Sequence, residues 1–278
     1  MKKISCNIFT VSNIQMFNWL KHSIHSFALL LLSITILMAS ASSLASDQEQ
    51  FPDVVSRVTK STLAIAIDAP IKHAAPRVLG TGFVVDTGEY AITNYHVVSQ
   101  VLDPTIVENY VVLSGEGTKV RKIKAEIVKI DPKHDLALLK LSETLEPSVL
   151  SSNELLPPGT DVAFTGFPIG AILGLYPATH RGYISAITPD AIPARNADEL
   201  TIAMMKRLQS TSLIYQLDAT AYPGNSGSPV YEPDTGNVVG VINKVLVKDT
   251  KESALSSPTG ISYAVPIKYV RELLERER

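Results

Sequence analysis

Most of the chain consists of short apolar runs separated by turns, and this pattern restricts the possible folds most strongly. The runs are rich in β-branched and aromatic residues and are bounded by Gly, Pro, Asn and Asp, as β-strands are. They cover residues 62–67, 82–86, 90–93, 109–113, 124–130, 136–141, 161–165, 183–187, 213–217, 237–243 and 261–265. Their near-regular spacing is typical of a sandwich or barrel, so the sequence predicts an all-β protein.

Three segments have helical rather than strand-like patterns. Phe51–Lys60 predicts a short helix before the first strand. Asn196–Gln209 begins with Asn196 as a candidate N-cap and has Glu199 three residues later, which is a variant of the capping box. Ile267–Arg278 predicts a helix after the last strand. We therefore expect an all-β domain with one short helical insertion and a C-terminal helix.

The first 45 residues have the composition of a secretory signal peptide. They contain three lysines and no acidic residue, then the apolar segment Phe27–Ala39, then small residues up to Ala45. We expect cleavage after Ala45; cleavage after Ala41 and a true start at Met16 stay open. The alternative is a retained membrane anchor, but an apolar segment of 13 residues is shorter than the roughly 20 that a spanning helix needs.

Charge and cysteine content exclude several classes of protein. The chain has 25 basic and 27 acidic residues, a net charge of −2, and without residues 1–45 the charge is −5. This balance argues against nucleic acid as a partner. The single cysteine, Cys6, lies in the leader, so neither a disulfide framework nor a cysteine-rich zinc site is expected. No metal-ligand spacing or phosphate-binding loop occurs, so we expect no metal and no cofactor.

A polar turn at residues 223–229, PGNSGSP, is the strongest candidate for chemistry. The glycines around Ser226 allow a tight turn in which backbone N–H groups converge on one point, as acyl transfer requires. A nucleophilic serine needs a base, and no histidine follows Ser226. Because Ser228 replaces the last glycine of a G-x-S-x-G elbow, an α/β-hydrolase is also excluded. His96 and Asp135 precede Ser226 and complete a His…Asp…Ser order.

Each of these residues also has an ordinary structural interpretation. A lone histidine at a strand end is more often a buried core residue, and a lone aspartate is more often a turn cap. Asp131 is a rival partner for His96, whereas His134 and Asp135 should point to opposite faces of a strand. His180 and Arg181 are interpreted as exposed loop residues, or as residues at the edge of a cleft.

Five blocks of sequence together resemble the trypsin-like serine proteases, specifically the bacterial Deg/HtrA type. The blocks are GTGFVVDTGEYAITNYHVV around His96, HDLALLKL around Asp135, QLDATAYPGNSGSPV around Ser226, and the later strands GNVVGVIN and GISYAVPI. They occur in the family's order and cover about residues 55–268. Single blocks are weak signals, but five in this order are highly specific.

The resemblance implies a chymotrypsin-like fold of two six-stranded antiparallel β-barrels with the active site in the cleft between them. The first barrel would span about residues 55–150 and the second about 155–266. The C-terminal helix 267–278 would follow. With a signal peptide at 1–45, the protease domain would occupy residues 46–278.

The resemblance also implies a role for each site residue. His96 would act as general base, Asp135 would orient its imidazole, and Ser226 would be the nucleophile. The N–H groups of Gly224 and Ser226 would form the oxyanion hole, with Asn225 between them shaping the turn. Thr220, Val245 and Leu246 are expected in the substrate pocket; since Thr220 is not acidic, small or medium aliphatic P1 residues are expected.

The sequence departs from the family pattern in three places. Deg/HtrA proteases usually carry PDZ domains after the protease, whereas only residues 267–278 follow the last strand here, so PDZ-based peptide capture is not carried over. The usual GNSGGP motif reads GNSGSP, with Ser228 in a tightly packed position. The segment Thr188–Ser212 inserts a helix-like stretch, which either regulates the site or simply covers the barrel.

These observations predict an exported serine endopeptidase that acts on proteins or peptides in the periplasm or outside the cell. The alternative is a catalytically silent protein with the same fold that binds peptides or partners. A third interpretation, an exported esterase, lacks its usual residue order and elbow. Contact with a membrane is expected only through an uncleaved leader, and the oligomeric state is left open.

Cleavage of the leader has a simple spectroscopic consequence. Trp19 is the only tryptophan, so a protein cut after Ala45 has none. We expect the exported form to show tyrosine emission alone, and the full-length precursor, purified as a control, to show tryptophan emission. Tryptophan emission from the exported form would mean that the leader is retained.

Overall fold

The computed structural model describes residues 49–275 apart from 104, 169–173, 191–210 and 246–259. The predicted leader and the predicted helix at 196–209 therefore lie outside the described residues. The described part contains twelve β-strands, two α-helices and one short 3₁₀ helix. Neither of its α-helices is long and apolar enough to cross a membrane.

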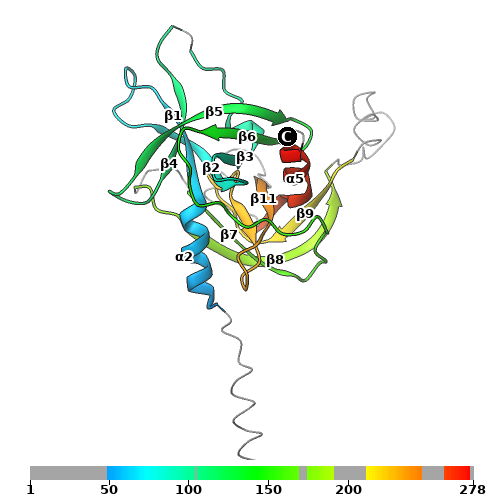
Figure 1. Cartoon of the computed structure of the whole chain (residues 1–278). Coiled ribbons are helices and arrows are strands. Elements are labelled where there is room, and N and C mark those ends of the chain that lie inside the picture. Colours follow the sequence, from blue (N-terminus) through cyan, green and yellow to red (C-terminus); the bar gives the residue numbers. More distant parts are fainter. Residues whose placement is uncertain (1–48, 104, 169–173, 191–210, 246–259, 276–278) are drawn as a thin grey trace, which may run out of the picture. The chain divides into compact units, whose positions relative to one another are not determined.

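The first six strands close into one antiparallel barrel (Figure 1). They are β1 (Thr62–Asp68), β2 (Arg77–Val85), β3 (Tyr90–Thr93), β4 (Asn109–Ser114), β5 (Arg121–Asp131) and β6 (Leu136–Leu141). Around the barrel their order is β1-β2-β3-β6-β5-β4, so β3 lies beside β6 and β1 beside β4. Closure pairs every strand on both sides and leaves no free sheet edge.

The second six strands close into another barrel, with the order β10-β11-β12-β9-β8-β7. They are β7 (Asp161–Gly166), β8 (Ala178–Pro189), β9 (Leu213–Asp218), β10 (Pro229–Tyr231), β11 (Val238–Val245) and β12 (Ile261–Pro266). The pairings between its strands are antiparallel. The predicted fold class, two six-stranded antiparallel barrels, is confirmed.

One strand was not among the sequence-predicted runs. β10 has only three residues and follows the glycine-rich turn directly, so it is too short for a recognisable alternation. It is a strand because β7 and β11 hold it on either side. Because β10 is held in the barrel, it fixes one end of the turn at residues 223–229.

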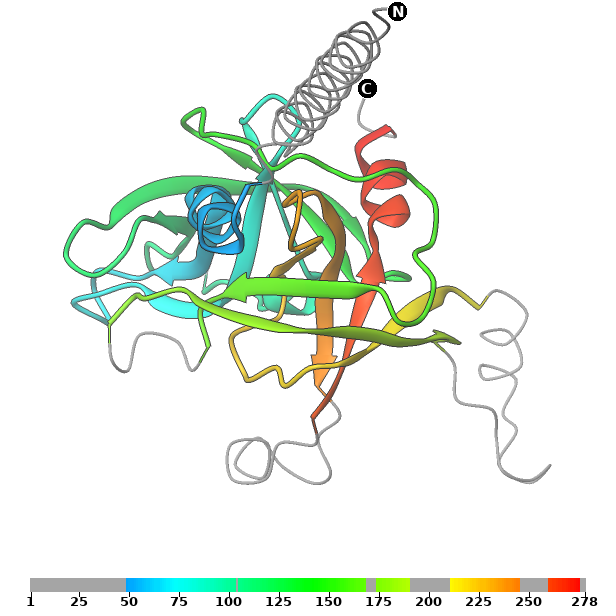
Figure 2. The ribbon, with the colours of Figure 1, turned by 90° about the horizontal axis from the view of Figure 1, so that it is seen from below.

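The two predicted flanking helices are present, and both pack where the barrels meet. The helix α2 (Phe51–Ser61) has Pro52 in its first turn and buries Val54 and Val58. The helix α5 (Ile267–Glu275) directly follows β12 and buries its apolar face. Their buried residues join Phe83 of the first barrel in one core cluster that also contains residues of the second barrel. Figure 2 shows the two helices on the same molecule from a second direction.

This shared core makes the stability of the two barrels interdependent. Phe83 is fully buried in it, beside Leu136 from its own barrel and Tyr231 from the other. We expect Phe83→Ala to lower the free energy of unfolding by about 3–5 kcal/mol, because truncating a buried aromatic ring leaves a cavity. Chemical denaturation with CD detection measures this loss. Val101→Ala, at a side chain that is 89% exposed, is the control and should change stability little. Two separate unfolding transitions would contradict a shared core.

Candidate active site

Strand pairing brings His96 and Asp135 together although they are far apart in sequence. His96 lies in the 3₁₀ helix η1 (Tyr95–Val97), directly after β3, and Asp135 directly precedes β6. β3 and β6 are neighbours, with Thr93 opposite Ala137. The end of one strand therefore lies beside the beginning of the other.

Asp135 holds His96 by two hydrogen bonds. The His96 backbone N–H donates to Asp135 Oδ1 at 2.9 Å, and His96 Nδ1 lies 2.6 Å from Asp135 Oδ2. A carboxylate can only accept, so the Nδ1–H donates, and the neutral ring carries its lone pair on Nε2. The His96 side chain is 47% exposed and that of Asp135 only 21%. This arrangement gives the imidazole the tautomer that a general base needs.

The backbone of Asp135 adopts a conformation that is uncommon for residues other than glycine. Its φ is +54°, in the left-handed region. Its carbonyl oxygen accepts hydrogen bonds from the Tyr95 N–H and from Asn94 Nδ2, both at 3.1 Å. Asn94 is completely buried. Strained backbone of this kind persists only where neighbouring groups hold it, and it concentrates at functional sites.

Ser226 lies in the turn at residues 223–229, which belongs to the second barrel and connects β9 to β10. Gly224 and Gly227 have φ values of +101° and +89°. A Cβ atom on Gly227 would collide with the Thr81 carbonyl oxygen, so the turn passes too close to β2 for any side chain there. The two glycines are thus required by backbone conformation and by close approach.

Thr81 of the first barrel binds this turn through its N–H and its hydroxyl. Its N–H donates to the Ser226 carbonyl at 2.8 Å, and its hydroxyl donates to the Gly224 carbonyl at 2.7 Å. The same hydroxyl oxygen accepts the Phe167 N–H at 3.0 Å, while the Thr81 carbonyl accepts the Thr93 hydroxyl at 2.7 Å. Thr81 is fully buried. Sequence reasoning missed this residue, because its role depends on contacts between the two barrels.

The predicted oxyanion-hole residues differ in how their N–H groups are used. Asn225 donates its N–H to the Tyr222 carbonyl at 3.0 Å, so this group is engaged in the turn itself. Within the described part of the chain, the N–H groups of Gly224 and Ser226 donate to no other group. They are therefore available to an incoming oxygen, whereas Asn225 shapes the turn.

The structure places Ser226 near η1 but does not join its hydroxyl to His96. The Ser226 carbonyl and the Val97 side chain both lie about 3 Å from the position that a Gly80 Cβ would take. The Ser226 hydroxyl points toward the Asn243 carbonyl, at a long 3.4 Å. Between the described side chains of His96 and Ser226 no hydrogen bond forms. Hydrogen bonds between catalytic groups are often long or poorly aligned in a protein without substrate.

The predicted pocket residues are only partly described. Thr220 is half-buried and lies just after β9. The backbone of Val245 ends β11 and pairs with Ser262 of β12, and the Ser262 hydroxyl donates to the Ala219 carbonyl at 3.0 Å. Val245 and Ala219, the residue before Thr220, therefore both contact Ser262 of β12. Leu246 lies outside the described residues.

Two further expectations from the sequence concern neighbouring polar residues. Asp131, the rival partner of His96, instead pairs with His134, whose Nδ1 lies 2.7 Å from Asp131 Oδ2. Ser228 does occupy a tightly packed position: its side chain is fully buried, and a Cβ on Gly166 would collide with its hydroxyl. Ser228 is accommodated because Gly166 has no side chain.

The interpretation of His180 and Arg181 as loop residues is wrong, because both lie in β8. The His180 ring stacks on Phe164, with centroids 4.9 Å apart, and its centroid lies 5.8 Å from that of Tyr222, which directly precedes the turn at residues 223–229. Burial lowers the pKa of His180. Arg181 is exposed and pairs with Asp161 of β7. The start of β8 was not evident from the sequence, because the strand begins at Ala178 whereas its β-branched and aromatic run begins at residue 183.

Among the described residues, no three His, Cys, Asp or Glu side chains gather as ligands of a metal ion would. The polar groups at the site are instead one imidazole, one carboxylate, one hydroxyl and two free N–H groups. These are the groups that acyl transfer uses without a metal.

The hydroxyl of Thr81 provides a test of how the turn is held. Thr81→Val keeps the shape of the side chain but leaves the Gly224 carbonyl and the Phe167 N–H without their partner. We expect it to lower the free energy of unfolding by about 1–3 kcal/mol for each buried group left unpaired. Thr81→Ser keeps the hydroxyl and should lose much less. Thermal unfolding of both variants measures this difference, and equal losses would contradict the assigned hydrogen bonds.

Comparisons with known proteins agree with this geometry. A family model described as "Trypsin-like peptidase domain" matches residues 80–241. A probable periplasmic serine endoprotease DegP-like of Halomonas elongata is 30% identical over 203 residues, which are 73% of this chain and 35% of that protein. The chloroplastic protease Do-like 5 of Arabidopsis thaliana is 30% identical, over 68% of this chain and 53% of its own. The chain thus spans about a third of the length of the DegP-like relative.

Solved structures show the same fold at low sequence identity. The active form of the Rv3671c protease from M. tuberculosis has a TM-score of 0.58 at 23% identity, over 80% of this chain and 82% of that one. The HtrA-type protease AlgW with a decapeptide has a TM-score of 0.60 at 21% identity, over 81% and 66%. Together with the family match across both barrels, these findings establish that the chain belongs to the trypsin-like peptidase family.

Proposed function

We propose that this protein is a serine endopeptidase that uses His96, Asp135 and Ser226 as a catalytic triad. The observation that carries the proposal is the His96–Asp135 pair, with Nδ1 and Oδ2 2.6 Å apart, beside a glycine turn that carries Ser226 and two unengaged N–H groups. The names of the relatives support it, since the DegP-like protein of Halomonas elongata is called a serine endoprotease.

Each group has one task in the proposed reaction. His96 Nε2 accepts the proton of the Ser226 hydroxyl as Oγ attacks the substrate carbonyl carbon. The resulting oxyanion is bound by the N–H groups of Gly224 and Ser226. The intermediate then expels the amine, which takes the proton from His96, and leaves an acyl-enzyme. A water molecule, deprotonated by His96, hydrolyses the acyl-enzyme and restores the serine.

The Ser226 hydroxyl must change direction before this reaction begins. In the structure it donates to the Asn243 carbonyl at 3.4 Å, a long and therefore weak bond. Rotation about one side-chain bond turns a serine hydroxyl toward a different acceptor at small energetic cost. We propose that substrate binding favours the orientation toward His96 Nε2.

The proposed substrates are proteins or peptides. Thr220, Val245 and Leu246 are assigned to the P1 pocket; because Thr220 is not acidic, an Arg or Lys side chain finds no counter-charge at that position. Small or medium aliphatic P1 residues are therefore favoured. Asp218, the nearest acid, ends β9 and is exposed rather than buried in the pocket.

The proposed location is outside the cytoplasm. Residues 1–45 serve as the export signal and residues 46–278 as the protease domain in this proposal. The names of the DegP-like relatives from Halomonas elongata and Marinomonas contain the word periplasmic, which supports export. Nucleic acid is not a proposed partner, because the chain is slightly acidic.

The second candidate is a peptide-binding protein without turnover. The observation in its favour is that the Ser226 hydroxyl is hydrogen-bonded to Asn243 and not to His96. Against it, a binding protein has no need of a carboxylate that selects one imidazole tautomer.

A fluorophosphonate probe distinguishes the two candidates, because it labels only an activated serine. We expect wild type to be labelled and Ser226→Ala to be unlabelled. In a separate assay, we expect Asp135→Asn to hydrolyse a peptide substrate about 10⁴-fold more slowly, because the imidazole loses its orienting acceptor. Ser228→Ala is the matched control, since it removes a buried hydroxyl from the same turn and should keep labelling. Folding of every variant is checked by CD.

The absence of labelling in correctly folded wild type, with and without added peptide, would favour the binding protein. Labelling that persists in Ser226→Ala would show that another residue reacts. Either result would overturn the proposed triad.

A further inference from the structure

We propose that a second His–Asp pair, Asp131 and His134, together with Tyr269 of α5, positions Asp135 for its contact with His96. The inference rests on the proposed function, because it concerns the orienting member of the triad. It makes Asp131, His134 and Tyr269 positioning residues, which act through Asp135 without touching substrate.

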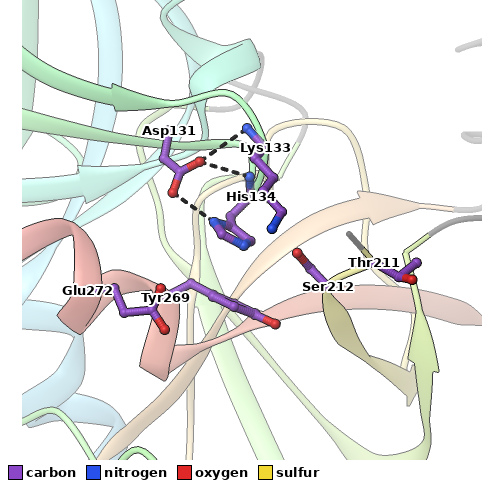
Figure 3. A pocket seen from close by; sticks show the side chains of 7 residues that line it. All are labelled: Asp131, Lys133, His134, Thr211, Ser212, Tyr269 and Glu272. Atoms are coloured by element: carbon purple, nitrogen blue, oxygen red, sulfur yellow. Dashed lines mark hydrogen bonds and ion pairs between the residues drawn. The ribbon is translucent and has the colours of Figure 1, made fainter. Parts of the chain in front are cut away.

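The turn that carries Asp135 is built on the Asp131 side chain. Asp131 ends β5 and pairs with Leu136, the first residue of β6, so only four residues make the turn. Asp131 Oδ1 accepts the N–H groups of Lys133 at 3.1 Å and of His134 at 3.2 Å. Its other oxygen, Oδ2, lies 2.7 Å from His134 Nδ1. Figure 3 shows these three contacts converging on one carboxylate.

This pair is buried, unlike the His96–Asp135 pair. The side chains of His134 and Asp131 are 7% and 8% exposed. The His134 ring stacks on Tyr269 with centroids 3.9 Å apart and planes 15° from parallel. The Tyr269 hydroxyl in turn accepts the N–H of Leu213, the first residue of β9, at 3.1 Å. The turn at residues 131–135 is therefore connected through α5 to the second barrel.

The position of His134 next to Asp135 explains why the contacts of His134 with Asp131 and Tyr269 matter for the active site. Asp135 has a φ of +54°, in the left-handed region where a side chain strains the backbone. On one side, Asn94, Tyr95 and His96 hold it by hydrogen bonds. On the other side, the preceding residue His134 is held by Asp131 and Tyr269. If that hold is lost, the turn relaxes and the carboxylate shifts relative to the imidazole.

A cavity borders the Asp131–His134 pair, and its position indicates which contacts hold the His134 ring. It has a volume of about 450 Å³ and is also lined by Lys133, Ser212 and Glu272 (Figure 3). Protein therefore does not enclose the ring on all sides. Its orientation depends on the hydrogen bond to Asp131 and on the stack with Tyr269, so each of these contacts should be separately measurable.

Substitutions at the pair separate the hydrogen bond from the stack. His134→Phe keeps a ring against Tyr269 but cannot donate to Asp131, whereas His134→Asn keeps a donor near the Nδ1 position and loses the ring. Asp131→Asn keeps the acceptor for the two turn N–H groups and replaces the other oxygen. Tyr269→Leu removes the stacked ring, and Tyr269→Phe removes only the hydroxyl.

We expect Asp131→Asn and His134→Phe to lower kcat about tenfold or more, with KM changed less than about twofold, because small displacements of catalytic groups affect the chemical step most. His134→Asn should recover part of that loss, and Tyr269→Leu should lose more than Tyr269→Phe. Thr62→Val is the control for general destabilisation: it removes a buried hydrogen bond from β1 to the Val58 carbonyl of α2, keeps the contacts of Asp131 and His134, and should leave kcat unchanged.

A second measurement does not depend on turnover. The His96 Nδ1 proton, held between nitrogen and carboxylate, gives a downfield NMR resonance that reports the His96–Asp135 contact directly. We expect this resonance to shift or broaden in Asp131→Asn and His134→Phe, and to be unchanged in Thr62→Val. If kcat falls only in proportion to the unfolded fraction, or if the resonance is the same in all variants, the proposed positioning role is overturned.

The two proposals fail in different ways. Wild type that neither reacts with the fluorophosphonate probe nor cleaves peptides would overturn the proposed function. The NMR comparison would still decide whether Asp131, His134 and Tyr269 position Asp135. Active wild type with no effect of the substitutions would overturn the positioning role alone.

Discussion

The hydrogen bonds of Thr81 are the interaction on which the site depends. This buried residue of β2 binds the carbonyl groups of both Gly224 and Ser226, so the first barrel holds the turn of the second. Buried polar groups of this kind fix geometry because any displacement leaves them unpaired. The close approach also explains Gly227, where any side chain would collide with Thr81. The shared core at Phe83 stabilises the two barrels, and Thr81 fixes the position of the turn at residues 223–229 relative to β2.

Asp135 shows how one short turn can serve two purposes. Its own side chain and carbonyl face η1, where they bind His96, Asn94 and Tyr95. The residue before it, His134, faces α5. The left-handed backbone conformation of Asp135 itself allows these opposite directions within four residues. Contacts on both sides offset the backbone strain. The C-terminal helix is therefore part of the support of the site and not only a cover for the barrels.

The family of this chain and the use of individual groups at its site are separate properties. The family match covers residues 80–241 and establishes which peptidase family this is. It does not describe the use of individual groups, such as the Asn225 N–H engaged by Tyr222 or the Ser226 hydroxyl bound to Asn243. Those details determine which atoms are available for chemistry.

The sequence by itself determined the all-β class, the flanking helices and the order His96, Asp135, Ser226, because alternation, capping and motif spacing are local properties. Only the tertiary structure decided the roles of Thr81, of the Asp131–His134 pair on Tyr269, and of His180 in β8. It also created β10, which has too few residues to form a strand without β7 and β11. The contacts of Thr81 with the turn, of His134 with Tyr269 and of His180 with Phe164 join residues that are distant in the chain. No local pattern specifies such contacts, since they exist only once both barrels have closed.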